Sequence, residues 1–104
     1  MAVIRFAVIG TSTITRKFLA VAAEVPSLQF VGAYSRSMER ARAFGAEYGA
    51  PLAFDSLDVL AGDERVDAVY IASPNACHSA QAVRLLRAGK HVLCEKPAAS
   101  NRRE

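Results

Sequence analysis

The feature that most constrains the fold is a stretch at the start of the chain in which an apolar run leads through a glycine directly into a helical pattern. Residues 4–9 have the length and composition of a buried strand, and Gly10 opens the turn Gly-Thr-Ser-Thr. Beyond the turn, apolar residues recur at helical spacing: Ile14, Phe18, Val21 and Val25. A strand that turns straight into a helix presents the free N–H groups of the first helical turn, which can bind a phosphate.

The rest of the chain repeats this alternation of strand and helix. Strands are expected at residues 4–9, 28–34, 52–54, 68–72 and 91–94, with helical patterns after each of the first four. Asn75 is expected to cap the fourth helix. The residues of this helix that are expected to face inward are Ala76, Ala80, Val83 and Leu86. Such an alternation predicts the α/β class, a doubly wound parallel sheet with strand order 3-2-1-4-5.

This strand order brings three distant segments of the chain to one edge of the sheet. The first and fourth strands become neighbours, and the chain changes direction between them, so a crevice opens beyond their carboxyl ends. Residues 10–13 lie on one side of this crevice and residues 73–75 on the other, while Lys96 follows the adjacent fifth strand. We therefore expect a functional site at this edge.

The turn after the first strand matches the dinucleotide fingerprint G-x-G-x-x-G/A only in part, since residues 10–15 read Gly-Thr-Ser-Thr-Ile-Thr. Ser12 stands where the backbone usually approaches a pyrophosphate most closely. Thr15 stands where a small residue usually lets the helix pack closely on the strand. By itself the motif fits a nucleotide-binding turn and also a purely structural one.

The end of the second strand carries information about the kind of nucleotide. An acidic residue there would bind the ribose hydroxyls of NAD, but this chain has Ser35 followed by Arg36. A hydroxyl and a guanidinium suit a ribose 2′-phosphate, so NADP is favoured and NAD is the alternative. The other interpretation of Arg36 is a solvated residue at the start of a helix.

Composition excludes several classes of function. A chain of 104 residues is large enough for one domain, and its net charge of +3 comes from scattered basic residues, so no nucleic-acid partner is expected. No apolar stretch approaches the ~20 residues needed to cross a bilayer, and Arg5 interrupts the first apolar run, so a cytoplasmic protein is expected. Cys77 and Cys94 lack the spacing of a metal site and are expected to be reduced thiols.

Three segments together resemble the N-terminal NAD(P)-binding domain of the glucose–fructose oxidoreductase, inositol dehydrogenase and MocA (Gfo/Idh/MocA) family. They are GTSTIT after the first strand, YSRSMERA after the second, and DAVYIASPNACHSAQAVRLLRAGKHVLCEKP toward the end. The third segment is by far the most specific, and the resemblance covers essentially the whole chain. It implies a Rossmann fold, NADP or NAD as cofactor, and hydride transfer to or from a sugar, a polyol or a related carbonyl compound.

The resemblance also implies roles for individual residues. Residues along the pyrophosphate would be Gly10, Thr11, Ser12, Thr13 and Ile14, and those at the adenosine ribose would be Ser35 and Arg36. The nicotinamide half would be lined by Ser73, Pro74, Asn75 and His78, with Glu95 and Lys96 beside it. Lys96 would be the catalytic residue, assisting proton transfer or holding the substrate hydroxyl, and Glu95 would pair with a basic group or orient Lys96. The bond from Lys96 to Pro97 is a candidate for a cis peptide.

Family members also have a larger C-terminal α/β domain. The resemblance therefore implies that residues 1–104 are an incomplete N-terminal Rossmann domain, without the sixth strand and the substrate domain, and inactive alone. The fifth strand would then be an exposed edge, which predicts either a marginally stable monomer or self-association, with a homo-oligomer as the favoured outcome. A function of another class stays open, namely a non-catalytic nucleotide-binding or interaction module on the same fold.

Overall fold

The computed structural model describes residues 3–10, 13–72 and 80–94. Its strands are β1 (Ile4–Ile9), β2 (Leu28–Tyr34), β3 (Leu52–Phe54), β4 (Ala68–Ile71) and β5 (His91–Cys94). Its helices are α1 (Thr13–Ala22), α2 (Met38–Glu47), α3 (Leu57–Gly62) and α4 (Ala80–Arg87). Among these residues, no helix has the length and apolar character that crossing a membrane requires.

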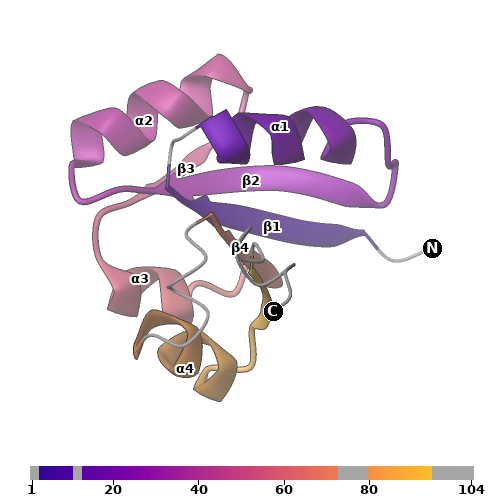
Figure 1. Ribbon diagram of the computed structural model, residues 1–104. Helices are drawn as coiled ribbons and strands as arrows, with labels where there is room; N and C mark the ends of the chain where they lie inside the picture. Colours follow the sequence, from indigo (N-terminus) through magenta and orange to yellow (C-terminus); the bar gives the residue numbers. More distant parts are fainter. Residues whose placement is uncertain (1–2, 11–12, 73–79, 95–104) are drawn as a thin grey trace, which may run out of the picture.

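The five strands form one parallel sheet in the order β3-β2-β1-β4-β5, which confirms the predicted topology. Helices α1 and α2 lie on one face of the sheet and α3 and α4 on the other (Figure 1). This division follows from right-handed crossovers, which run to one side of β1 first and to the other side afterwards. The carboxyl ends of β1 and β4 are joined by a hydrogen bond of 3.2 Å from the N–H of Ala72 to the carbonyl oxygen of Ile9.

An irregularity in β2 changes which of its later side chains face each half of the core. Phe6 of β1 pairs with Phe30, but the next residue, Ala7, pairs with Gly32, so Val31 is an extra residue in β2. Such a bulge resets the alternation of side chains along the strand. Val31 and Tyr34, three residues apart, consequently both pack in the cluster that includes Ala7, on the α3 and α4 side. Phe30 and Ala33 both pack in the cluster that includes Phe6, beneath α1.

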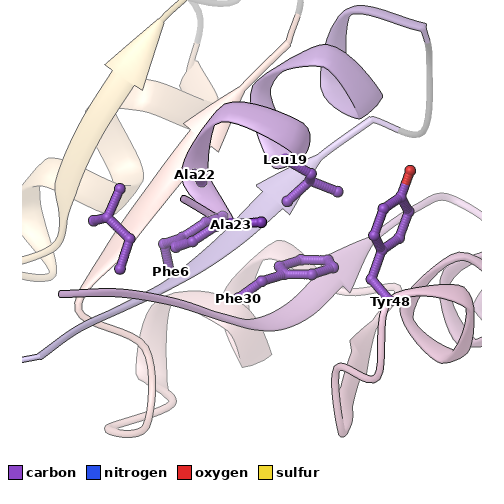
Figure 2. Close-up of a pocket in the computed structure, with 7 residues that line it drawn as sticks. Phe6, Leu19, Ala22, Ala23, Phe30 and Tyr48 are labelled. Atoms are coloured by element: carbon purple, nitrogen blue, oxygen red, sulfur yellow. The ribbon is translucent and has the colours of Figure 1, made fainter. Parts of the chain in front are cut away.

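Aromatic rings attach α1 and the end of α2 to the sheet. Phe18 of α1 stacks on Tyr70 of β4 with ring centres 4.0 Å apart, and Phe6 stacks on Phe30 at 5.5 Å. Tyr48, just after α2, meets the ring of Phe30 edge-on at 6.0 Å. Phe6, Phe30, Tyr48 and the last turn of α1 line an apolar cavity of about 100 Å³. Figure 2 shows these side chains around it. These contacts fix α1 on the sheet, with its N-terminal end at the carboxyl edge.

The predicted inward face of α4 was wrong, and the apolar pattern of α1 is only partly buried. In α1 the buried residues include Leu19 and Ala22, and in α4 they are Ala82 and Leu85. Ala80, Val83 and Leu86 of α4, which were expected to face the core, are exposed, as are Val21 and Val25 of the pattern in and after α1. Both helices carry apolar residues on two adjacent stripes, and periodicity cannot choose between them. The small Ala22 and Ala82 allow the closer approach to the sheet.

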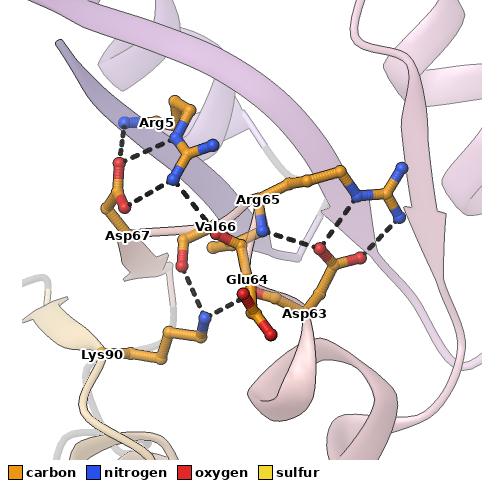
Figure 3. A network of polar contacts seen from close by, with 7 residues as sticks. All are labelled: Arg5, Asp63, Glu64, Arg65, Val66, Asp67 and Lys90. Atoms are coloured by element: carbon orange, nitrogen blue, oxygen red, sulfur yellow. Dashed lines mark hydrogen bonds and ion pairs between the residues drawn. The ribbon is translucent and has the colours of Figure 1, made fainter.

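A polar network ties the amino ends of β1, β4 and β5 together, at the edge opposite the predicted crevice (Figure 3). The Nε and Nη2 atoms of Arg5 each donate to a different carboxylate oxygen of Asp67 at 3.0 Å. The backbone N–H of Arg5 also donates to Asp67, at 2.9 Å. The Nζ atom of Lys90 donates to the carbonyl oxygens of Asp63 and Val66, each at 2.5 Å. The bonds from Arg5 lower the pKa of Asp67 to about 2.

This shift predicts acid-sensitive stability that depends on Asp67. Its carboxyl has a pKa of about 3.9 in an unfolded chain and about 2 in the folded protein. The stabilisation is therefore present above pH ~4 and is lost as the pH falls toward ~2. We expect Asp67→Asn to lower the free energy of unfolding at pH 7 and to flatten its decline between these pH values, as measured by urea denaturation.

Asp58 provides the control, because its exposed carboxylate makes a single 3.2 Å contact with Arg84. Asp58→Asn should change the free energy of unfolding at pH 7 by less than ~1 kcal/mol, because exposed ion pairs contribute little to stability. Identical pH profiles for Asp67→Asn and the unsubstituted chain would contradict the role given to Asp67.

Candidate cofactor-binding site

The turn that leaves β1 requires a glycine on two grounds. Gly10 has φ of +104°, a conformation that residues with side chains rarely adopt. A Cβ atom at this position would also lie 3.3 Å from the Cβ of Ala72, at the end of β4. The backbone of Gly10 therefore passes close to the neighbouring strand immediately before the chain enters α1 at Thr13.

Thr15 fits this turn although it departs from the dinucleotide fingerprint. Its side chain is fully buried, and its hydroxyl donates to the carbonyl oxygen of Gly10 at 3.3 Å. This hydrogen bond connects the first turn of α1 to Gly10, the residue after β1. The first N–H groups of a helix lack intrahelical partners, and α1 has no acidic residue in its first turn, so this end of the helix suits an anion.

A cleft of about 300 Å³ opens beside this turn, between the carboxyl ends of β1 and β2 and the start of α4. The described residues that line it come from these elements and from the first turn of α2: Ile9, Gly10, Tyr34, Ser35, Arg36, Arg40 and Gln81. The two residues predicted at the adenosine ribose, Ser35 and Arg36, thus share a cleft with the first residue of the phosphate turn. Among the described residues that line it, none has a carboxylate.

The cleft carries positive charge that no described residue neutralises. Arg36 and Arg40 are exposed, and neither guanidinium has a hydrogen-bond or ion-pair partner within the described part of the chain. Local hydrogen bonds hold the segment between them. The Ser35 hydroxyl accepts from the N–H of Ser37 at 3.3 Å, and the Ser37 hydroxyl caps α2 by accepting from the N–H of Arg40 at 3.3 Å. Two guanidinium groups and a hydroxyl can together bind a phosphate monoester.

Two residues of the cleft, Arg40 and Gln81, were not predicted from the sequence. Arg40 could have been found, because it lies in the first turn of the helix that follows Ser35 and Arg36. Gln81 had no local signal. It reaches the cleft because α4 begins beside β1 in space, which only the packing of the helix on the sheet determines.

Several predicted site residues lie outside the described part of the chain. They are Thr11, Ser12, Ser73, Pro74, Asn75, His78, Glu95 and Lys96, and with them Ala76, Cys77 and the bond from Lys96 to Pro97. Ile14 is placed by its backbone in the first turn of α1. The structure does describe the strand ends from which the later segments depart. Ile71 pairs with Cys94, so β4 and β5 end together at the carboxyl edge that also bears Gly10.

Comparison with known proteins agrees with this geometry. Residues 4–104 match the sequence model of the Gfo/Idh/MocA family, described as an oxidoreductase family with an NAD-binding Rossmann fold. The chain is 54% identical over 101 residues to scyllo-inositol 2-dehydrogenase (NADP(+)) IolU of Bacillus subtilis, covering 97% of this chain and 31% of that protein. It is 42% identical over 95 residues to 1,5-anhydro-D-fructose reductase of Ensifer adhaerens, covering 91% of this chain and 28% of the reductase.

A solved structure shows the same fold. The crystal structure of KijD10, a 3-ketoreductase from Actinomadura kijaniata in complex with TDP-benzene and NADP, superposes with a TM-score of 0.81 at 36% identity. The match covers 91% of this chain and 30% of KijD10. The chain thus spans about 30% of the length of the relatives that it matches.

The two grounds for Gly10 can be separated by substitution. Gly10→Ala should destabilise the fold by more than the ~1–2 kcal/mol typical of a side chain in a left-handed conformation, because the added methyl also meets Ala72. Gly49 has φ of +77° and no atom within 4 Å of an added Cβ, so Gly49→Ala should show the conformational cost alone. Urea denaturation measures both.

A second substitution tests the close contact directly. Combining Gly10→Ala with Ala72→Gly removes the atom 3.3 Å from the new Cβ and should restore part of the lost stability. A Gly10→Ala variant no less stable than Gly49→Ala would show that the approach of Gly10 to β4 does not constrain this turn.

Proposed function

The chain belongs to the Gfo/Idh/MocA family of oxidoreductases, and from this premise we propose that it is the cofactor-binding part of an NADP-dependent dehydrogenase or reductase. The observation that carries the proposal is the cleft in which Ser35, Arg36 and Arg40 converge, with no carboxylate among the described residues that line it. We infer that residues 1–104 act as the dinucleotide-binding domain, because the relatives are about three times as long as the matched region.

The choice of NADP over NAD follows from charge. A carboxylate at the end of β2 would accept hydrogen bonds from the ribose hydroxyls and repel a 2′-phosphate. In its place, two guanidinium groups and the Ser35 hydroxyl offer donors and positive charge to a phosphate. The relative from Bacillus subtilis is named for NADP(+), and KijD10 was crystallised with NADP, which supports the same preference here.

The pyrophosphate is assigned to the turn after β1. Its proposed contacts are the residues from the end of β1 into the first turn of α1: Gly10, Thr11, Ser12, Thr13 and Ile14. The φ of Gly10 and the buried hydrogen bond from Thr15 support this assignment, since they bring backbone without a side chain to the start of a helix. A cofactor that filled both places would run from the turn into the cleft that Gly10 also lines.

The chemistry is assigned to residues that follow β4 and β5. By similarity to the family, the nicotinamide half of the site consists of Ser73, Pro74, Asn75, His78, Glu95 and Lys96. A bound nicotinamide cofactor supplies or accepts a hydride. The ammonium of Lys96 would give a proton to the substrate oxygen during reduction and would stabilise the developing charge there, and Glu95 would orient it. The names of the relatives support a sugar, a polyol or a related carbonyl compound as substrate.

Cofactor titration tests the proposal. The unsubstituted chain should bind NADPH more tightly than NADH in isothermal calorimetry. Arg36→Ala and Arg40→Ala should each raise the Kd for NADPH about tenfold, since a hydrogen bond to a charged group contributes ~1.5–3 kcal/mol. Neither substitution should change the Kd for NADH by more than about twofold, because NADH has no 2′-phosphate.

Arg42 is the matched control, because it is an exposed arginine of α2 that does not line the cleft. Arg42→Ala should leave both affinities unchanged. Equal weakening of NADPH and NADH by Arg36→Ala would contradict recognition of the 2′-phosphate, and failure of the unsubstituted chain to bind either cofactor would contradict nucleotide binding.

We also propose that the protein acts in the cytoplasm, where NADPH is maintained as a reductant.

We further propose that the chain forms a homo-oligomer. The support for association is the edge strand β5 of the described sheet, where Leu93 is 55% exposed. Leu93 lines an apolar hollow of about 320 Å³ together with Ile4 and Phe18. Sedimentation should show a species larger than a monomer that Leu93→Lys dissociates, and a strictly monomeric unsubstituted chain would contradict this.

A further inference from the structure

Arg16, in the first turn and a half of α1, is held by several groups at the end of α2. Its Nη1 and Nη2 atoms donate to the two carboxylate oxygens of Glu47, the latter at 3.2 Å. Nη1 also donates to the hydroxyl of Tyr48 at 3.1 Å. The guanidinium carbon lies 4.8 Å from the ring centre of Phe44 and 5.8 Å from that of Tyr48. The orientation of Arg16 is thus determined by three side chains of one neighbouring segment.

This cluster is the polar connection between the two helices. In the described part of the chain, no other side chain forms a hydrogen bond or ion pair between α1 and the segment from α2 to Tyr48. An exposed ion pair alone contributes little to stability. A bidentate pair that also stacks on aromatic rings, however, restricts the geometry of the groups that it joins.

The same cluster lies next to the proposed cofactor site. Arg16 and Glu47 line a groove between the helices together with Arg40, Ala43 and Phe44, and Arg40 also lines the ribose cleft. The pyrophosphate turn leads directly into α1, and the ribose cleft leads directly into α2. The spacing between the two halves of the site therefore depends on the pairing of β1 with β2, which places Ile9 beside Tyr34, and on the relative placement of the two helices that follow.

We propose that Arg16 is a positioning residue for the dinucleotide: by joining α1 to the end of α2, it holds the pyrophosphate turn and the ribose-phosphate cleft at the spacing of one cofactor molecule. The inference rests on the proposed function. A ligand that spans two subsites gains affinity when the distance between them is fixed beforehand, because the second contact then costs less entropy. A ligand that occupies one subsite gains nothing from the fixed spacing.

Glu47 separates positioning from simple attraction of the cofactor's phosphates. If Arg16 acted only through its positive charge, removal of the neighbouring carboxylate would strengthen the binding of an anion. If Arg16 acts by joining the helices, removal of the carboxylate weakens the binding of the whole dinucleotide. The two explanations thus predict opposite effects of Glu47→Ala.

The experiment compares NADPH with adenosine 2′-monophosphate, which occupies only the ribose-phosphate cleft, by isothermal calorimetry. Glu47→Ala and Arg16→Met should each raise the Kd for NADPH about tenfold and change that for adenosine 2′-monophosphate by less than about twofold. Arg16→Lys should recover part of the affinity for NADPH. Arg42→Met, which removes a positive charge from α2 outside the groove, is the control and should change neither Kd.

Three results would overturn the inference. They are tighter binding of NADPH by Glu47→Ala, equal weakening of both ligands, and unchanged binding of NADPH by Arg16→Met. Thermal unfolding of each variant, measured alongside, should show a folded protein, since Arg16 and Glu47 are exposed. Failure of the unsubstituted chain to bind NADPH would contradict the proposed function itself, and the inference with it.

Discussion

The parallel pairing of β1 with β2 on one side and β4 on the other is the constraint on which the rest of the structure depends. A central parallel strand is buried on both faces, so each neighbouring strand must be reached by a crossover that covers one face. The change of direction after β3 leaves the carboxyl ends of β1 and β4 side by side. Glycine fits the position where the chain leaves β1, because a side chain at residue 10 would strain the backbone and lie close to Ala72.

Within the described residues, the arginines of the cleft have no carboxylate partner, whereas several arginines elsewhere do. Arg5, Arg65 and Arg84 are paired with carboxylates away from the cleft, and Arg16 is paired with Glu47 between α1 and α2. The arginines that line the cleft have no such partner in the described residues. An exposed guanidinium costs little free energy while it is hydrated, so it can be left for a ligand. The two available guanidinium groups in the cleft are the physical basis of the proposed preference for NADP.

The strands and their order could be predicted from sequence because a strand buried on both faces is a continuous apolar run, and the rules for crossovers leave few topologies. The inward faces of α1 and α4 could not, since residues such as Val21 and Leu86 form a second apolar stripe that only packing excludes. The extra residue Val31 in β2 has no local signal. In the site, Ser35 and Arg36 followed from their place at a strand end, whereas Gln81 enters the cleft through the tertiary placement of α4.

The central claim is that the cleft beside the β1 turn binds the 2′-phosphate of NADP. The most direct measurement is nuclear magnetic resonance of the ¹⁵N-labelled chain during titration with NADP⁺ and, separately, with NAD⁺. We predict that both cofactors shift the backbone amide of Gly10, and that only NADP⁺ shifts the Nε–H signals of Arg36 and Arg40. Equal shifts of the arginine signals with both cofactors, or shifts confined to other parts of the chain, would contradict the account.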